Sequence, residues 1–467
     1  MSSDLRKSLS LPMLIALGAA GIMGTSWIFT ASDFFRDYGA GGEIFGLLAG
    51  AVLAVCVALA YAELASRYPR AGGEVVFAFA AFGRGWAFVA GWLLLGAYVS
   101  SLAFYVSASG MLLSELLPIM RTMPIYSVAG TTVFLPSLAV GVILCIGVWL
   151  LTSSGMNRAG RFQMLLFSIM ICIGIVLAIT GFSTGSFENF WPAFEDDANP
   201  YTNTIRFILP AMTFLTGFSL VSTLAEDADM SQRKIGIAVI ATVVVAAMFY
   251  CTVLLATAWI VPWQETAALE DGVIDAFRLA GFPALAWSAF AISVLGLLTS
   301  FVALFPAASR LVLAMARAGL FPRAFANVGP SGRPGNALLF TLVLTLGLGW
   351  LGRGALLWFL DTGGVYVGLA WCIAVVSLYR VRRIHGAVEP PFRARPFWLP
   401  GLGALAALCV IAVILIPGTS MSLIWPYEYA ILGVWTVLGI VIYALAPRRT
   451  ESEMRRAVLG NAGDDDP

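Results

Sequence analysis

The sequence predicts an all-α membrane protein with 12 transmembrane helices. Hydrophobic residues make up 60% of the 467 residues and charged residues only 11%, whereas soluble domains are about 25% charged. The chain contains about a dozen apolar segments of the ~20 residues that a helix needs to cross a bilayer. Little of the chain is left for a soluble domain. The formal net charge of +1 gives no reason to expect a nucleic-acid partner.

The expected spans follow one another along the chain, separated by short polar or charged loops. They cover residues 10–36, 42–66, 84–117, 133–152, 157–182, 203–229, 235–262, 283–316, 336–351, 355–380, 398–416 and 424–446. The stretch 264–281 is too polar to cross a membrane, and it contains an amphipathic run from Ala267 to Ala280. We interpret this stretch either as a short helix on the outer surface or as a plain connecting loop.

The positively charged residues orient the chain, because short cytoplasmic loops carry an excess of Lys and Arg. With the N-terminus inside, nearly all of the 27 Lys and Arg residues fall in cytoplasmic loops and tails. The exceptions, in the outer loops, are Arg36, Arg121, Arg206, Arg278 and Arg353. We therefore expect a multi-pass protein of the plasma membrane, which in a bacterium is the inner membrane, with both termini in the cytoplasm.

The first span contains three glycines at a spacing of three, Gly18, Gly21 and Gly24, and the sixth span contains Thr216-Gly217. Each glycine costs a helix about 1 kcal/mol relative to alanine. Broken helix backbone is tolerated in a bilayer only where it is buried in protein or lines a cavity. Two Gly-interrupted spans in corresponding halves of a chain therefore indicate a transporter binding site. The alternative is that these glycines serve close helix packing.

The two interrupted spans lie five spans apart, so the second half of the chain must enter the membrane from the opposite side. This arrangement predicts a 5+5 inverted repeat with discontinuous helices 1 and 6, plus two C-terminal helices. The expected units are a cytoplasmic N-terminus (1–9), a first five-helix repeat (10–182), a second, inverted repeat (203–380), helices 11 and 12 (398–446) and a disordered cytoplasmic tail (447–467).

Two further stretches lie at the inner ends of spans 2 and 8. The first reads Tyr-Ala-Glu-Leu-Ala-Ser-Arg-Tyr-Pro-Arg-Ala-Gly-Gly-Glu over residues 61–74, and the second runs from Ala307 to Pro322. Together with the broken spans, these stretches resemble the amino acid–polyamine–organocation (APC) superfamily of permeases, over about residues 10–385. The resemblance implies a leucine-transporter-like fold and alternating-access transport of amino acids or small amines.

The broken spans offer backbone groups to a small zwitterion. Amides freed around Gly24 to Trp27 lie at a helix N-terminus, which favours an anion such as a carboxylate. Carbonyls freed near Gly217 are free to accept from an ammonium group. No charged side chain lies in the middle of spans 1, 3, 6 or 8, which favours a zwitterionic or neutral substrate. The candidate substrate-binding residues are Gly21, Gly24, Thr25, Ser26, Trp27, Tyr98, Ser101, Phe214, Thr216 and Gly217.

Several of these positions have a second interpretation. Tyr98 and Ser101 serve helix packing in the alternative reading, and Phe214 is a candidate lid over the substrate. The span 1 motif of the family reads Gly-Ser/Ala-Gly, but this chain has Thr25 and Ser26 after Gly24. The extra bulk leaves a small organic amine as an alternative to an ordinary α-amino acid.

The coupling ion is a separate question. Proton-linked members of the family place a lysine in span 5, where this chain has Met170, so a lysine-based proton switch cannot operate. Sodium-coupled relatives of the fold place a Thr/Ser pair of span 8 against two span 1 carbonyls. Carried over to this chain, the candidate sodium site consists of Ala20, Met23, Gly296, Thr299 and Ser300. The alternatives are that the two hydroxyls bond back to their own helix and that the protein is an exchanger without ion coupling.

The acidic residues that close span 6 predict an inner gate. Glu226 and Asp227 lie at its cytoplasmic end, and Arg67 lies in a neighbouring loop. Salt bridges among these residues would break when the inner side opens. The alternative is helix capping and simple solvation.

An enzyme is not expected, because no titratable or metal-binding residues converge at depth in the sequence. We expect no cofactor other than a sodium ion for coupling. The partners expected are a small-molecule substrate and the lipid bilayer, and the oligomeric state is left open. A channel or sensor built on the permease fold remains the alternative to a transporter.

Overall fold

The computed structural model describes residues 5–24, 26–114, 116–195, 199–330, 332–386, 388–418, 422–447 and 450–460. One of the expected site residues, Thr25, lies outside these ranges, and Ser26 is described by its backbone only. The chain is predominantly helical, as expected from its composition.

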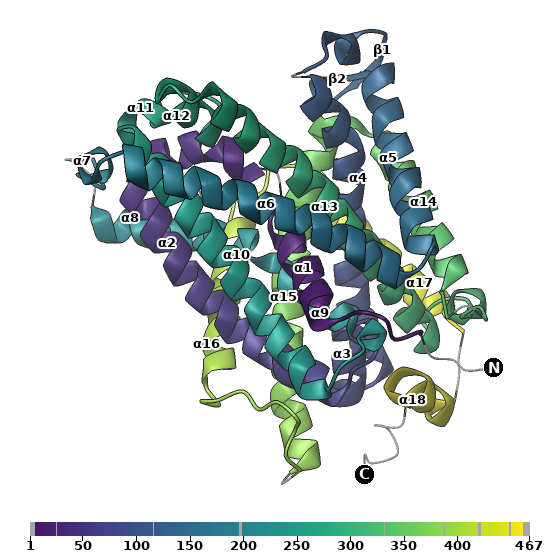
Figure 1. Ribbon diagram of the computed structural model, residues 1–467. Coiled ribbons are helices and arrows are strands. Elements are labelled where there is room, and N and C mark those ends of the chain that lie inside the picture. The colour runs from purple at the N-terminus through teal and green to yellow at the C-terminus, as the bar shows by residue number, and fades with distance from the viewer. Residues whose placement is uncertain are drawn as a thin grey trace.

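Figure 1 shows the arrangement of the elements. The α-helices are α1 (Leu11–Ile22), α2 (Ser26–Arg67), α3 (Glu74–Phe82), α4 (Arg84–Ser114), α5 (Leu135–Ser153), α6 (Met156–Thr184), α7 (Phe187–Phe190), α8 (Pro200–Phe214), α9 (Ser219–Thr223), α10 (Gln232–Ile260), α11 (Trp263–Ala267), α12 (Val273–Leu279), α13 (Pro283–Arg317), α14 (Gly335–Gly349), α15 (Gly352–His385), α16 (Leu399–Leu415), α17 (Tyr427–Leu445) and α18 (Glu451–Leu459). The 3-10 turns are η1 (Pro118–Arg121), η2 (Thr216–Phe218), η3 (Ala225–Asp227) and η4 (Arg323–Ala326), and the strands are β1 (Pro124–Val128) and β2 (Thr131–Phe134).

Among the described residues, nine helices are long and apolar enough to cross a membrane. Three shorter apolar helices, α1, α14 and α16, overlap the expected spans 10–36, 336–351 and 398–416. Long apolar helices of this kind are what a bilayer requires, because every backbone polar group must be satisfied inside its own segment. The chain is therefore a multi-pass helical membrane protein.

The first expected span is broken, as predicted. Helix α1 ends at Ile22 and α2 begins at Ser26, and the intervening Met23 and Gly24 are not helical. Helix α2 continues through the second expected span, and a kink at Gly39, where φ is 74°, divides it. Glycine tolerates this positive φ without the steric penalty that a Cβ would bring.

The sixth expected span is broken as well. Helix α8 ends at Phe214, the turn η2 follows Leu215, and α9 resumes at Ser219. Pro210 lies inside α8 and removes one of the amide donors of that helix near its end. Beyond α9, the short turn η3 carries Glu226 and Asp227, both buried.

Helix α1 lies near the centre of the molecule (Figure 1), where it packs against α6, α10 and α13 and against η2. Helix α18 lies at one end of the molecule, and the hairpin β1–β2 lies at the other end with α11 and α12 (Figure 1). The two breaks are thus enclosed by helices rather than exposed on the surface.

Residues 264–281 are partly helical. The structure divides this stretch into the end of α11 and the whole of α12, and not into one run from Ala267 to Ala280. Gly272, with φ of 49°, separates the two helices, and its amide donates to the Ser32 hydroxyl at 2.9 Å. The helical interpretation is therefore confirmed, but as two short helices fastened to α2.

The expectation of a disordered tail is wrong for part of residues 447–467. Helix α18 forms over Glu451–Leu459, and Met454, Val458 and Leu459 on it are buried. It packs against α3 and α13. Although the tail is mostly polar, Met454 and Val458 are four residues apart, and this spacing places both on one helix face.

Candidate functional site

The two breaks touch each other through their backbones. A Cβ added at Gly217 would lie 2.6 Å from the carbonyl carbon of Gly21 and 2.6 Å from the amide of Ile22. A Cβ added at Gly21 would in turn overlap the Leu220 side chain. These contacts support the alternative prediction for Gly21 and Gly217, which is that both glycines allow close helix packing.

Gly24 differs from these two glycines. Apart from its chain neighbours, no described residue has a heavy atom within 4 Å of the place where its Cβ would be, and Gly24 is half-buried. Its amide donates to the Ile22 carbonyl at 2.8 Å across the break. Gly24 therefore borders open space in the middle of the molecule, beside the N-terminus of α2.

Side chains from other helices bind the carbonyls that α1 frees at its end. The Tyr250 hydroxyl, from α10, donates to the Ile22 carbonyl at 2.8 Å. The Ser300 hydroxyl, from α13, donates to the Ala20 carbonyl at 2.9 Å. Such donors compensate for the lost helical hydrogen bonds and so stabilise the break.

Aromatic side chains surround the start of α2. Trp27 is buried, with its ring centroid 5.7 Å from that of Phe249 and 5.0 Å from that of Tyr250. Phe214 is half-buried, 5.7 Å from the Phe34 ring and 6.4 Å from the Tyr250 ring. The structure therefore brings Trp27 and Phe214 to the same aromatic cluster, on either side of Tyr250.

The other expected substrate residues are spread around the breaks. Tyr98 is buried, and its hydroxyl lies 3.2 Å from that of Ser219 at the start of α9. The Ser101 hydroxyl donates to the Ala97 carbonyl at 3.0 Å within its own helix. Thr216 lines a small cavity against α15 and α16. Tyr98 thus lies against the second half of the broken span.

The expected sodium-site residues lie together. A Cβ at Gly296 would lie 3.0 Å from the Met23 carbonyl oxygen, so the glycine allows α13 to approach the break. Ser300 contacts the Ala20 carbonyl, as described above. Thr299 instead donates back to the Gly296 carbonyl at 3.1 Å, which is the alternative interpretation. The structure thus brings Ser300, and not Thr299, to the α1 carbonyls.

The two acids of η3 are buried in ion pairs. Glu226 accepts two bonds from Arg317, at 2.6 and 3.0 Å, and Arg70 lies 3.7 Å away. Asp227 accepts two bonds from Arg310, at 2.9 and 3.1 Å. Both arginines come from the C-terminal part of α13. The inner network, as we call these five residues, therefore ties the broken span to α13.

The prediction that Arg67 pairs with Glu226 and Asp227 is wrong. Its guanidinium donates to the Val388 carbonyl at 2.7 Å. The partners Arg310 and Arg317 are seven residues apart on α13, a spacing that places both on one helix face. That spacing was visible in the sequence, but only the fold shows that this face meets η3.

The N-terminal segment is bound to the same acids. The Leu5 amide donates to Glu226 at 2.9 Å, and the amides of Ser8 and Leu9 donate to the Asp227 carbonyl at 2.8 and 2.9 Å. Burial raises the pKa of Glu226, but Arg317, Arg70 and the amide of Ala71 more than offset that effect, and the pKa falls to about 2. Glu226 is therefore an anion at every physiological pH.

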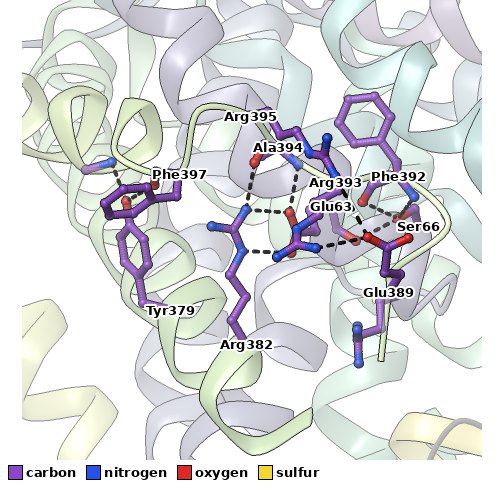
Figure 2. A network of polar contacts seen from close by, with 12 residues as sticks. Glu63, Ser66, Tyr379, Arg382, Glu389, Phe392, Arg393, Ala394, Arg395 and Phe397 are labelled. Atoms are coloured by element: carbon purple, nitrogen blue, oxygen red, sulfur yellow. Dashed lines mark hydrogen bonds and ion pairs between the residues drawn. The ribbon is translucent and has the colours of Figure 1, made fainter. Parts of the chain in front are cut away.

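A second inner cluster, missed from the sequence, surrounds Glu63 near the end of α2 (Figure 2). Arg382 of α15 donates to both of its carboxyl oxygens, at 2.9 and 2.7 Å, and the Ala394 amide donates at 2.8 Å. The Phe392 amide donates to the Ser66 hydroxyl at 3.2 Å. These bonds fasten the segment between α15 and α16 to α2.

Comparisons with known proteins agree with this architecture. A family model described as an amino acid permease matches residues 9–440. The chain is 26% identical over 444 residues to the branched-chain amino acid permease BcaP of Lactococcus lactis subsp. cremoris, with 92% of each chain covered. It is 27% identical over 463 residues to the methylthioribose transporter of Bacillus subtilis, covering 96% of this chain and 95% of the relative. It is also 27% identical over 341 residues to cationic amino acid transporter 4 of Homo sapiens, covering 71% of this chain and 53% of the relative.

These relatives are permeases and transporters, not enzymes, which agrees with the expectation from the sequence. The resemblance to the APC superfamily is confirmed as well. Because the family match extends over nearly the whole chain, this protein belongs to the amino acid permease family and, with it, to the amino acid–polyamine–organocation superfamily.

Proposed function

We propose that this permease is a secondary active transporter that moves a neutral amino acid across the plasma membrane by alternating access. The observation that carries the proposal is the pair of broken helices whose breaks meet at Gly21 and Gly217, with open space beside Gly24. Discontinuous helices at the repeat interface are the sites where transporters of this architecture bind substrate. A small organic amine is the alternative substrate.

The proposed topology has 12 spans, with α1 and the first part of α2 as span 1, and α8, η2 and α9 as span 6. Residues 10–182 and 203–380 form the two inverted five-helix repeats, and both termini are cytoplasmic. Supporting this orientation, the basic inner ends of α2, α13 and α15 lie at the same end as α18 (Figure 1). In a bacterium the membrane is the inner membrane.

In the proposed pose, the substrate carboxylate lies at the N-terminus of α2, near Ser26, where the helix dipole favours an anion. The ammonium donates to carbonyls freed at the breaks. Thr25, Trp27, Tyr98, Ser101, Phe214 and Thr216 complete the proposed pocket. The apolar and aromatic surroundings, with no charged side chain in the middle of α1, α4 or α13, favour a neutral side chain over a cationic one.

The inner network is the proposed gate. It joins η3, at the end of span 6, to α13, which is span 8, and so bridges the two helix groups that rock against each other in this architecture. Opening to the cytoplasm would separate Glu226 and Asp227 from Arg317 and Arg310. Because buried ion pairs are costly to leave unpaired, the pairs hold the inner side closed until opening lets water reach them.

Sodium is proposed as a coupling ion at the oxygens around Ser300. The supporting observation is that Ser300 and the carbonyls of Ala20 and Met23 gather beside Gly296. Hydroxyl and carbonyl oxygens suit a hard cation. Uptake measured with choline in place of sodium, and again with Thr299→Ala and Ser300→Ala, tests this part. Uptake that is unchanged in choline and in both variants would exclude sodium.

Counterflow in proteoliposomes tests the main proposal. Vesicles preloaded with unlabelled L-leucine are expected to take up external labelled L-leucine faster than empty vesicles, whereas labelled L-lysine is expected to give a weaker response. A channel would show no such trans-stimulation. Acceleration by a neutral amino acid supports the transporter, and equal rates with and without internal L-leucine, L-lysine or small amines would refute it.

A further inference from the structure

The Gly72-Gly73 turn precedes α3 and packs against the half-helix α9, and it places Glu74 next to α9. Both glycines have positive φ angles, 105° and 47°, which residues other than glycine rarely adopt. The Gly72 amide donates to the Thr223 carbonyl at 3.2 Å. A Cβ added at Gly73 would lie 2.7 Å from the Ser222 hydroxyl oxygen. This close approach delivers the next side chain, Glu74, to the inner side of the broken span.

Glu74 is fully buried, and neither of its carboxyl oxygens has a hydrogen-bond partner among the described residues. The amides of the next three residues do not serve it, because they donate to the carbonyls of Gly72 and Gly73. The titratable groups that face it are the hydroxyls of Tyr61, on α2, and Tyr98, on α4. Both are neutral donors, so neither supplies the charge that a carboxylate needs.

The charged side chains on the elements packed around α3 are engaged elsewhere. Their partners are Asp227 for Arg310 and Glu226 for Arg317 on α13, Glu63 for Arg382 on α15, and backbone carbonyls for Arg84 on α4. Arg380 and Arg383 on α15 are exposed, and Cys372 on that helix adjoins Tyr61. Glu451 and Arg455 of α18 lie near Phe79 and Gly83, at the opposite end of α3.

A carboxylate moved from water into such surroundings without a cation costs several kcal/mol, so the group takes up a proton instead. Burial raises the pKa of Glu74 to about 8, although its own backbone N–H and the Tyr61 hydroxyl lower it. Helix α3 is not among the spans that cross the membrane. Opening of the inner side would therefore bring this carboxyl into contact with cytoplasmic water.

Building on the transport function above, we propose that the Glu74 carboxyl is a proton-binding site of the transport cycle. It holds its proton while the turn is closed against α9 and releases it to water when the inner side opens, which leaves a carboxylate and one H⁺. The Tyr98 and Ser219 hydroxyls, 3.2 Å apart, lead from the carboxyl toward the break. The carboxylate must take up a proton again before the inner side closes, since closing would bury a bare carboxylate. Release and uptake both occur at the cytoplasmic face, so no proton crosses the membrane, and closing of the inner side depends on cytoplasmic pH.

Infrared difference spectroscopy of the full-length protein in detergent tests the site without any substrate. As the pH rises from about 6 to about 9, the wild-type protein is expected to lose the carbonyl band of the protonated Glu74 carboxyl. The band is expected to be absent from Glu74→Gln and present in Glu43→Gln. Glu43 is a matched control, because it is also buried and one of its carboxyl oxygens has no partner among the described residues. The same titrating band in Glu74→Gln as in wild type would overturn the proposal.

Flux measurements test the role in transport. In wild type and in Glu43→Gln, counterflow of labelled L-leucine is expected to slow as the pH on the cytoplasmic side rises from about 6 to about 9, because closing of the inner side requires the proton. In Glu74→Gln this pH dependence is expected to be lost, because a neutral amide mimics the protonated carboxyl. The same pH dependence in Glu74→Gln as in wild type overturns the proposal. Absence of counterflow in the wild type refutes the proposed function instead, and the infrared band still decides the site.

Discussion

Glu226 and Glu74 are both buried acids, and they differ in what surrounds them. Glu226 accepts bonds from Arg317, from the Leu5 amide and from the Ala71 amide, with Arg70 nearby. Glu74 has no such partner among the described residues. A paired carboxylate stays charged and holds elements together, whereas an unpaired one is held neutral and changes its charge when water reaches it. The difference separates an acid that fastens elements together from one whose charge is proposed to change during transport.

The largest expected effect comes from unpairing Glu226. Arg317→Met removes the arginine that donates to both carboxyl oxygens and is expected to destabilise the protein by about 3–5 kcal/mol, because the buried charge is left undercompensated. The thermal unfolding temperature in detergent measures the change. Arg67→Met is the control, since the hydrogen bond of Arg67 among the described residues goes to a backbone carbonyl, and it is expected to change stability by about 0.5 kcal/mol or less. The double variant with Glu226→Gln should recover part of the loss. Equal unfolding temperatures for Arg317→Met and wild type would contradict this fastening role of Glu226.

The pH dependence of stability distinguishes the two acids next. The folded-state pKa of Glu74, about 8, exceeds its ordinary value of 4.5. The folded state therefore holds more protons than the unfolded state between these values, and stability is expected to fall there as the pH rises, by up to about 1.4 kcal/mol per pH unit. Glu74→Gln should flatten this decline in the unfolding temperature measured from about pH 5 to about pH 8. An unchanged slope would show that Glu74 does not hold the proton.

Glu226 has the opposite sign. Its folded-state pKa of about 2 lies below its ordinary value of 4.5, so its contribution to stability is complete above about pH 4.5 and is lost as the pH falls toward 2. Glu226→Gln is expected to flatten the acid side of the stability curve and to leave the slope at neutral pH unchanged. A change confined to neutral pH would reverse the assignment of the two acids.

Two glycines at the breaks also differ in their surroundings, because Gly217 is in close contact with the first break and Gly24 borders open space. Gly217→Ala places a methyl group 2.6 Å from backbone atoms of the first break and is expected to cost about 1–3 kcal/mol in stability. Gly24→Ala meets no atom of the described residues within 4 Å, its chain neighbours apart, and is expected to leave the unfolding temperature nearly unchanged while slowing counterflow. Equal thermal effects of the two variants would mean that the breaks are not in contact.

The smallest expected effects concern the hydroxyls of α13. Thr299→Ala removes a bond within the helix, and Ser300→Ala removes the bond to the Ala20 carbonyl. Each is expected to cost about 0.5–1.5 kcal/mol. Ser300→Ala should affect transport more, because only this hydroxyl reaches the first break. A larger loss of uptake in Thr299→Ala than in Ser300→Ala would contradict this placement.

The sequence predicted both helix breaks, because glycine spacing acts locally and a bilayer penalises unsatisfied backbone wherever it occurs. It predicted the acids of the inner network but not their partners, since Arg67 and Arg317 are both basic residues at inner helix ends and only packing decides which one meets Glu226. Glu74 was read as part of a loop motif. Its burial depends on the approach of the Gly72-Gly73 turn to α9, which no local pattern encodes.

The N-terminal segment gives the inner network a property that the helices alone would lack. The Leu5 amide is fastened to the Glu226 carboxylate, and the amides of Ser8 and Leu9 are fastened to the backbone of Asp227, directly ahead of α1. Any tilt of α1 must therefore move the N-terminal segment relative to both acids. A bulky fusion placed before Leu5, or removal of the first eight residues, is expected to change the rate of transport. An affinity tag for this permease should therefore be placed elsewhere.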